Sequence, residues 1–123
     1  AYGSDTVPAF WSRRSPNPAP LRLDTPEAIA RFFKTRGALG LGGGMLVANP
    51  VPAEHEIPAD EMAGFIAAAQ ADAEAGAVSG KAVTPFLLAR ILELTGGRSL
   101  ATNIALVENN ARLAARIAAA QSA

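Results

Sequence analysis

Few side chains in this sequence could serve as a nucleophile, a proton donor or a metal ligand. The chain has two lysines, Lys34 and Lys81, one histidine, His55, and no cysteine, which excludes disulfides, thiolate nucleophiles and cysteine metal sites. A lysine nucleophile requires an apolar pocket or a cationic neighbour. Lys81 lies in a loop between a glycine and a helix start, which favours an ordinary surface lysine. His55 has no second ligand three or four residues away, so no metal site is predicted.

Other polar side chains are better suited to binding a ligand than to reacting with it. Arg13 and Arg14 are either solvated or contact an anion, since a guanidinium holds phosphate through a planar fork of donors. Asn103 and Asn110 are seven residues apart, which places them on nearly the same face of a helix. They either satisfy neighbouring backbone groups, or Asn103 reaches a polar ligand. Asn49 either forms a turn or faces the ligand crevice at the end of a strand.

Four helices are predicted to position these residues. They cover residues 26–36, Pro58 to near Gly76, 85–94, and about 100–121. Thr25, Thr84 and Ser99 are the expected N-caps, and proline follows the first two at the first helical position. The third helix carries apolar residues around most of its circumference, so we expect it to be buried on more than one side.

The segment between the first two helices contains a glycine cluster over residues 37–44, followed by an apolar run over 45–49 that prolines close. We predict that 45–49 is a buried strand. The glycine cluster is not a phosphate loop of the Walker type, because it precedes a strand and no Gly-Lys-Ser/Thr follows it. It either allows two backbones to pack closely or allows a ligand to approach bare backbone.

Residues 1–24 are expected to form an extended arm, because four prolines remove backbone donors and fix the φ angle. Tyr2, Phe10 and Trp11 give this arm more aromatic surface than a solvated linker carries. The arm therefore packs either against another part of the protein or as a surface loop of this same domain. The rest of the domain, residues 25–123, holds the helices and the central strand.

Composition narrows the classes of protein to consider. Half of the residues are apolar and fewer than a fifth are charged, which is typical of a globular chain. Eleven basic and eleven acidic residues balance, so no patch for nucleic acid or a membrane surface is indicated. No apolar run approaches the roughly 20 residues of a membrane-spanning helix. No signal peptide is visible, and the absence of cysteine fits the cytoplasm. Because the sequence lacks a first methionine, we expect it to begin partway through a longer protein.

A set of motifs, in order and with similar spacing over essentially the whole chain, is shared with one protein family. They are Tyr2-Gly3-Ser4-Asp5, Pro8-Ala9-Phe10-Trp11-Ser12-Arg13, the run from Gly40 to Pro52, the run from Gly80 to Leu88, Thr95-Gly96-Gly97, Ser99-Leu100, the run from Asn103 to Val107, and Asn109-Asn110-Ala111. Together they resemble the C-terminal portion of the pseudouridine-5′-phosphate glycosidases, also called the indigoidine synthase A-like family.

The resemblance implies the fold class α/β, with this chain as the C-terminal part of a three-layer α/β/α protein, holding about four helices and one or two strands. It also implies an enzyme that reversibly cleaves the C–C glycosidic bond of pseudouridine 5′-phosphate to uracil and ribose 5-phosphate. Carbon is a poor leaving group, so the family opens the sugar and holds its C1 as an imine on a lysine, which delocalises the developing charge. A homotrimer and a divalent metal, commonly manganese, are implied as well.

The resemblance places the reactive residues outside this stretch. The family's lysine nucleophile, general-acid glutamate and metal-ligating aspartate would lie N-terminal to Ala1, and neither Lys34 nor Lys81 matches the nucleophile's motif. We therefore expect no catalytic and no metal-binding residue in this segment, which would be inactive without its N-terminal portion. Asn103 matches a polar position that faces the substrate, and Asn49 is a weaker candidate for the same role.

Two alternatives remain open. The chain could belong to a relative with the same imine chemistry, a C-glycosynthase that joins ribose 5-phosphate to an aromatic acceptor in a biosynthetic pathway. The Ala- and Arg-rich composition of the chain suits a GC-rich genome, in which such biosynthetic relatives occur. The chain could also be a non-catalytic helical interaction module. In both enzymatic readings the partners are a small nucleotide or sugar phosphate and the N-terminal portion of the same protein. Neither nucleic acid nor a membrane is expected as a partner.

Overall fold

The first helix shows how local sequence signals build the chain. In the computed structural model, which describes residues 1–123, α1 runs over Pro26–Ala38. The Thr25 hydroxyl accepts a hydrogen bond from the backbone N–H of Ala28 at 3.1 Å, as the predicted N-cap requires. Pro26 has no N–H to satisfy, and Glu27 lies at the positive end of the helix dipole. The helix prediction is confirmed, with two further residues at the C-terminal end.

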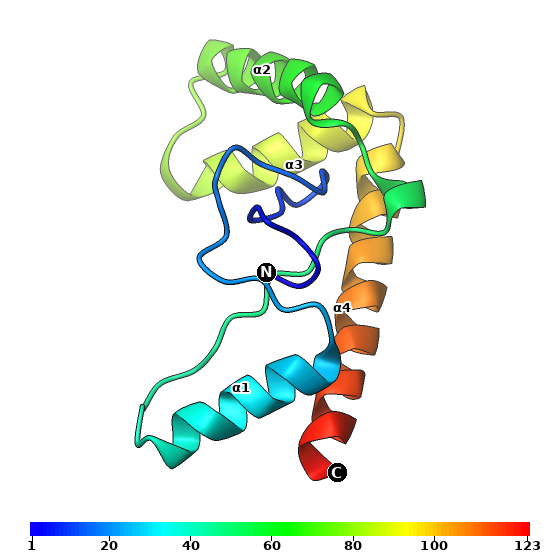
Figure 1. Cartoon of the computed structure of the whole chain (residues 1–123). Helices are drawn as coiled ribbons and strands as arrows, with labels where there is room; N and C mark the ends of the chain where they lie inside the picture. The colour runs from blue at the N-terminus through cyan, green and yellow to red at the C-terminus, as the bar shows by residue number, and fades with distance from the viewer.

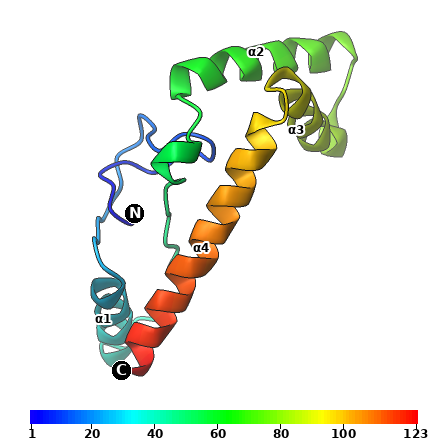
Figure 2. The same ribbon diagram turned by 90° about the vertical axis from the view of Figure 1, so that its right-hand side faces the viewer.

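The other three predicted helices are also present. They are α2 (Ala59–Ala75), α3 (Val83–Leu94) and α4 (Arg98–Ser122), with 3-10 turns η1 (Ala53–His55) and η2 (Gly80–Ala82) ahead of α2 and α3. α2 and α3 pack together near the N-terminal end of α4, while α1 packs near its C-terminal end (Figure 1). The second view shows α4 as the long axis that joins these two groups (Figure 2). No helix of the chain combines the length and the apolar character that a membrane crossing requires.

Two of the predicted N-caps are wrong. Thr84 lies inside α3, because η2 already starts the turn ahead of it. Ser99 lies inside α4, whose N-cap is Gly97 with a φ of 89°, a left-handed conformation that glycine adopts without strain. The hydroxyl of Thr95 instead links the two helices. It donates to the carbonyl of Ile91 at 2.8 Å and accepts from the N–H of Ser99 at 3.1 Å.

The predicted buried strand over 45–49 is absent, so this prediction is wrong for the chain as it stands. A single backbone hydrogen bond, from the N–H of Tyr2 to the carbonyl of Ala48 at 2.9 Å, joins the segment to another one, and Leu46 is 93% exposed. A strand needs a neighbour along its length to pair its N–H and C=O groups. The chain offers only isolated bridges, which are Tyr2 with Leu23, Thr6 with Pro18, and Ala9 with Ser12.

The main buried cluster lies between α2, α3 and the segment that leads into α2. Ile57, Met62, Ala69 and Ile91 form it, each at most 3% exposed. Only 16 of 123 residues are buried, so much apolar surface stays open. The expectation that α3 is buried on more than one side is wrong, because Ile91 is its one buried residue and Leu88 is 48% exposed.

Residues 1–24 form an arm without a helix that folds onto the chain's own residues (Figure 1). The Ser12 hydroxyl donates to the carbonyl of Ile57 at 2.7 Å, and the N–H of Ile57 donates to the carbonyl of Trp11 at 3.0 Å. The indole N–H of Trp11 donates to the carbonyl of Ser99 at 3.3 Å. Of the two alternatives for the arm, these contacts favour a surface segment of this same domain.

Replacing Ser12 with alanine tests the contact between the arm and Ile57. Ser12 is 3% exposed, so Ser12→Ala leaves a buried carbonyl without its partner. We expect the free energy of unfolding to fall by about 1–3 kcal/mol. Ser15→Ala is the matched control, since the Ser15 hydroxyl donates to the Val7 carbonyl at an exposed site, and its effect should stay below about 0.5 kcal/mol. Urea unfolding measures both, and equal effects would contradict the assigned role of Ser12.

Candidate functional site

A cavity of about 260 Å³ opens between the arm, α3 and α4. Its walls are mostly apolar, with the side chains of Phe10, Trp11, Leu88, Leu92 and Leu100 among them, and Asn103 supplies an amide. An apolar cleft with a few polar groups is the usual form of a site for a small organic molecule. We call this cavity the Asn103 cavity.

The aromatic wall of the Asn103 cavity is held in a fixed geometry. The rings of Phe10 and Trp11 meet edge to face, with centroids 4.5 Å apart and planes at 81°. Phe10 has a φ of 50°, a left-handed conformation that is rare for a residue other than glycine. Backbone strain of this kind persists where the surrounding structure enforces it, and it is common at ligand sites. The wall therefore offers flat apolar faces suited to a planar ring.

Asn103 is the one asparagine of α4 whose side chain makes no hydrogen bond to the protein. The amide N–H of Asn109 donates to the Pro50 carbonyl at 3.2 Å, and Asn110 accepts from the amide of Asn49 at 3.0 Å. Asn109 therefore satisfies a backbone group, whereas Asn110 pairs with a side chain, so the backbone partner predicted for Asn110 is not found. Asn103 is half-buried and keeps its amide donors and its carbonyl available within the cavity.

Asn49, the second predicted binding residue, lies apart from the Asn103 cavity. It lines a different cavity, of about 400 Å³, together with Met45 and with several residues of α4, among them Asn110 and Leu113. Its amide is engaged by Asn110, which gives Asn49 a structural partner. The two predicted binding residues are therefore not brought together into one cavity, and the role of each in substrate binding stays a prediction.

The residues capable of covalent or metal chemistry lie away from these cavities. Lys34, Lys81 and His55 are exposed, and none of them lines either cavity. His55 belongs to η1, where its backbone carbonyl accepts from the Thr102 hydroxyl at 2.8 Å. No group of three or more His, Asp or Glu side chains is arranged to hold a metal ion.

The glycine cluster over 37–44 shows no close backbone packing, and its contacts are with the end of α1. A Cβ added at any of its five glycines would meet nothing within 4 Å, so close backbone packing is not found in this chain. Arg36, at the end of α1, instead donates to the carbonyls of Gly42 and Gly44 at 2.9 and 3.0 Å. Gly40 and Gly43 have φ angles of 69° and 85°, which only glycine adopts without strain. The cluster is thus a loop closed on the C-terminus of α1.

Comparison with known proteins places this chain. A sequence model of the family described as "Indigoidine synthase A like protein" matches residues 1–120. The chain belongs to this family. The family resemblance inferred from the motifs is thereby confirmed, from the start of the arm to the last turns of α4.

The curated relatives carry one name. A "Pseudouridine-5′-phosphate glycosidase" of Mesorhizobium japonicum is 75% identical over 119 residues, which are 97% of this chain and 39% of the relative. One of the same name from Methylobacterium nodulans is 67% identical over 119 residues, 97% of this chain and 35% of the relative. The chain therefore spans about two fifths of the length of the curated relatives that it matches.

Two solved structures share the fold. The prealnumycin C-glycosynthase AlnA, in complex with ribulose 5-phosphate, has a TM-score of 0.88 at 26% identity, covering 98% of this chain and 40% of that chain. An indigoidine synthase A-like protein from Thermotoga maritima has a TM-score of 0.75 at 36% identity, covering 95% and 39%. The predicted fold class, part of a larger α/β protein, is confirmed by these likenesses.

The two asparagines of α4 that contact Asn49 and Pro50 give a stability test. Asn109→Ala leaves the carbonyl of Pro50, a buried residue, unpartnered, whereas Asn110→Ala breaks an exposed contact and removes a poor helix former. We expect Asn109→Ala to lower the free energy of unfolding by about 1 kcal/mol more than Asn110→Ala does. Thermal unfolding of the two variants measures this difference. A larger loss for Asn110→Ala would contradict the assignment.

Proposed function

We propose that this chain is the C-terminal portion of a pseudouridine-5′-phosphate glycosidase, an enzyme that reversibly cleaves a C–C glycosidic bond to release uracil and ribose 5-phosphate. The observation that carries the proposal is the 75% identity, over 97% of the chain, to a protein of that name. The matched 119 residues include nearly all of the arm, α3 and α4, which together form the Asn103 cavity. The lysine that forms the imine with the opened sugar belongs to the N-terminal portion of the same protein.

In this proposal the Asn103 cavity receives the planar base. Phe10 and Trp11 supply flat apolar faces, and a pyrimidine ring can pack on them. The amide of Asn103 offers both a donor and an acceptor, which suits a uracil edge that presents N–H and C=O groups side by side. Holding the base in place while the carbon–carbon bond breaks is a positioning role, and it leaves proton transfer and imine formation to residues of the N-terminal portion.

The remaining features of the enzyme are proposed on the family alone. We place its divalent metal, manganese, on residues beyond this stretch, because the chain has no arrangement of carboxylates and histidine for a metal. No step of the reaction is assigned to that metal here. A homotrimer and a cytoplasmic location complete the proposal, and the absence of cysteine fits a reducing compartment.

A C-glycosynthase is the second candidate. The structure with ribulose 5-phosphate that shares this fold is named as one, and its TM-score of 0.88 shows how closely the two chains agree. Its identity of 26% is far below the 75% of the glycosidase, which favours the glycosidase. A non-catalytic helical module is the weakest reading, since residues 1–120 match a family that includes these enzymes. Assays that offer uracil or an aromatic acceptor together with ribose 5-phosphate separate breakdown from biosynthesis.

The position of the nucleophile can be tested by trapping the imine. We expect borohydride and ribose 5-phosphate to label the N-terminal portion of the intact protein and to leave Lys34 and Lys81 unlabelled, because both are exposed and outside the cavities. Lys34→Arg and Lys81→Arg should keep full activity. Peptide mass spectrometry locates the label. A label on Lys81 would overturn the placement of the nucleophile outside this segment.

Asn103→Leu tests the base-binding role in the intact enzyme. Removing the amide leaves a polar edge of the base unpaired, so kcat/KM should fall about 10- to 100-fold, equivalent to about 1.4–2.7 kcal/mol. Asn110→Leu is the matched control on the same helix, since its side chain contacts Asn49 in another cavity. Uracil binding, followed by the fluorescence of Trp11, should weaken only in Asn103→Leu. Equal losses in the two variants would exclude a specific role for Asn103.

A further inference from the structure

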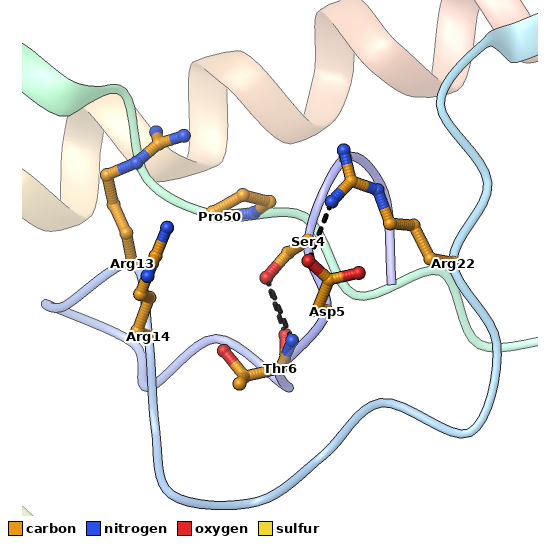
Figure 3. A pocket seen from close by; sticks show the side chains of 8 residues that line it. Ser4, Asp5, Thr6, Arg13, Arg14, Arg22 and Pro50 are labelled. Atoms are coloured by element: carbon orange, nitrogen blue, oxygen red, sulfur yellow. Dashed lines mark hydrogen bonds and ion pairs between the residues drawn. The ribbon is translucent and has the colours of Figure 1, made fainter.

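A polar cavity of about 130 Å³ lies within the arm, and the proposed reaction makes no use of it. No hydrophobic side chain lines it, and its residues are Gly3, Ser4, Asp5, Thr6, Arg13, Arg14, Arg22 and Pro50. Figure 3 shows Arg13 and Arg14 together on one side of the cavity, with Asp5 and Arg22 on the other. We call it the arginine cavity.

Only one of its three guanidinium groups is neutralised by the chain. Arg22 pairs with Asp24 at 2.7 Å and with Asp5 at 2.9 Å, and the carboxylates of Asp24 and Asp5 raise the pKa of Arg22. Asp5 is the one acid in the lining, and it is already engaged by this pair. The charges of Arg13 and Arg14 therefore have no carboxylate of the cavity to balance them.

The two remaining arginines meet no acid elsewhere in the chain. The guanidinium of Arg13 donates to the neutral carbonyl of Val51, and Arg14 makes no hydrogen bond within the chain. Glu56 lies near, but its carboxylate accepts from the backbone N–H of Arg13 at 2.8 Å and not from the guanidinium. Two neighbouring positive charges with donors to spare are the arrangement that recognises an oxyanion.

A hydroxyl in the same lining also lacks a partner. The Thr6 hydroxyl oxygen is buried from water and makes no hydrogen bond, the one such side-chain atom in the chain. A buried donor left unpaired costs free energy, so a rotation of the Thr6 side chain that lets its hydroxyl donate to a ligand in the cavity is favoured. The backbone of Thr6 is held by the Ser4 hydroxyl, which donates to its carbonyl at 2.7 Å and accepts from its N–H at 3.2 Å. The position of Thr6 in the lining is thus set by a local turn.

We propose that the arginine cavity binds the phosphate group of inorganic phosphate or of a phosphate ester, with Arg13, Arg14 and Thr6 as its donors. A volume of about 130 Å³ leaves room for one small tetrahedral anion. The site is distinct from the Asn103 cavity in every lining residue, and it requires no glycosidase activity. The balanced net charge of the chain argues for this small anion over a nucleic acid backbone.

Isothermal titration calorimetry on the intact protein with inorganic phosphate tests the site, at constant ionic strength with chloride as the balancing anion. We expect phosphate to bind, and Arg14→Gln to raise its Kd at least tenfold, because Arg14 has no other partner in the chain. Thr6→Val keeps the shape of the side chain and should raise the Kd several-fold. Arg112→Gln is the matched control, since Arg112 is exposed on α4 and pairs with Glu108, and its Kd should stay within twofold of the parent. Circular dichroism confirms that each variant is folded.

Each outcome decides the proposal. Absence of phosphate binding, or a Kd that is the same in Arg14→Gln and in the parent, would overturn it, as would an acidic residue of the N-terminal portion found against Arg13 and Arg14. A second titration, with ribose 5-phosphate, identifies the source of the anion. If Arg14→Gln raises the Kd of ribose 5-phosphate as much as that of inorganic phosphate, the ligand is a sugar phosphate. If the Kd of ribose 5-phosphate is unchanged, the ligand is free phosphate. If uracil is released normally while Arg14→Gln has no effect on phosphate binding, this site fails and the proposed function stands. If phosphate binding depends on Arg14 in a protein that releases no uracil, this site stands and the proposed function fails.

Discussion

Both cavities of the arm depend on one short turn and the buried hydroxyl that fixes it. Ala9 and Ser12 exchange backbone hydrogen bonds at 2.9 Å, which closes the turn around Phe10 and Trp11. The Ser12 hydroxyl then binds the carbonyl of Ile57, next to the buried cluster of α2 and α3. Because Trp11 lines the Asn103 cavity and Arg13 lines the arginine cavity, this single contact helps to position the walls of both cavities. A proline-rich arm without regular structure can hold them only because it is anchored there.

The chain leaves apolar surface open at Leu46 and along α4. Leu46 is 93% exposed, while Leu100, Ile104 and Val107 on α4 are between 50% and 58% exposed. Apolar area of this extent gains free energy when another surface covers it. The relatives are more than twice as long as this chain, so the family has the residues that could supply such a cover. A strand over 45–49 would need a neighbour along its length as well, because a strand cannot satisfy its backbone alone.

The parts of the fold that follow from local signals could be predicted from the sequence, and those that require distant partners could not. Thr25 caps α1 as expected, since a hydroxyl, a proline and an acid act within one turn. The strand over 45–49 failed because no segment of the chain pairs with it along its length, although its apolar composition is that of a strand. In the site, the resemblance singled out Asn103, and the structure adds Phe10 and Trp11 as its neighbours. No local pattern could bring Arg22 to Arg13, because only the fold of the arm joins them.

The open apolar surface of α4 also borders the Asn103 cavity. Leu100 lines the Asn103 cavity, and Ile104 follows Asn103 directly on α4, yet both side chains are half exposed. An open cavity admits water, which competes for the amide of Asn103 and weakens electrostatic interactions with a ligand. In the proposed enzyme, covering this face of α4 would both bury the leucine and isoleucine and exclude water from the base. The free energy of joining the two portions and the formation of a dry site would then come from the same contact.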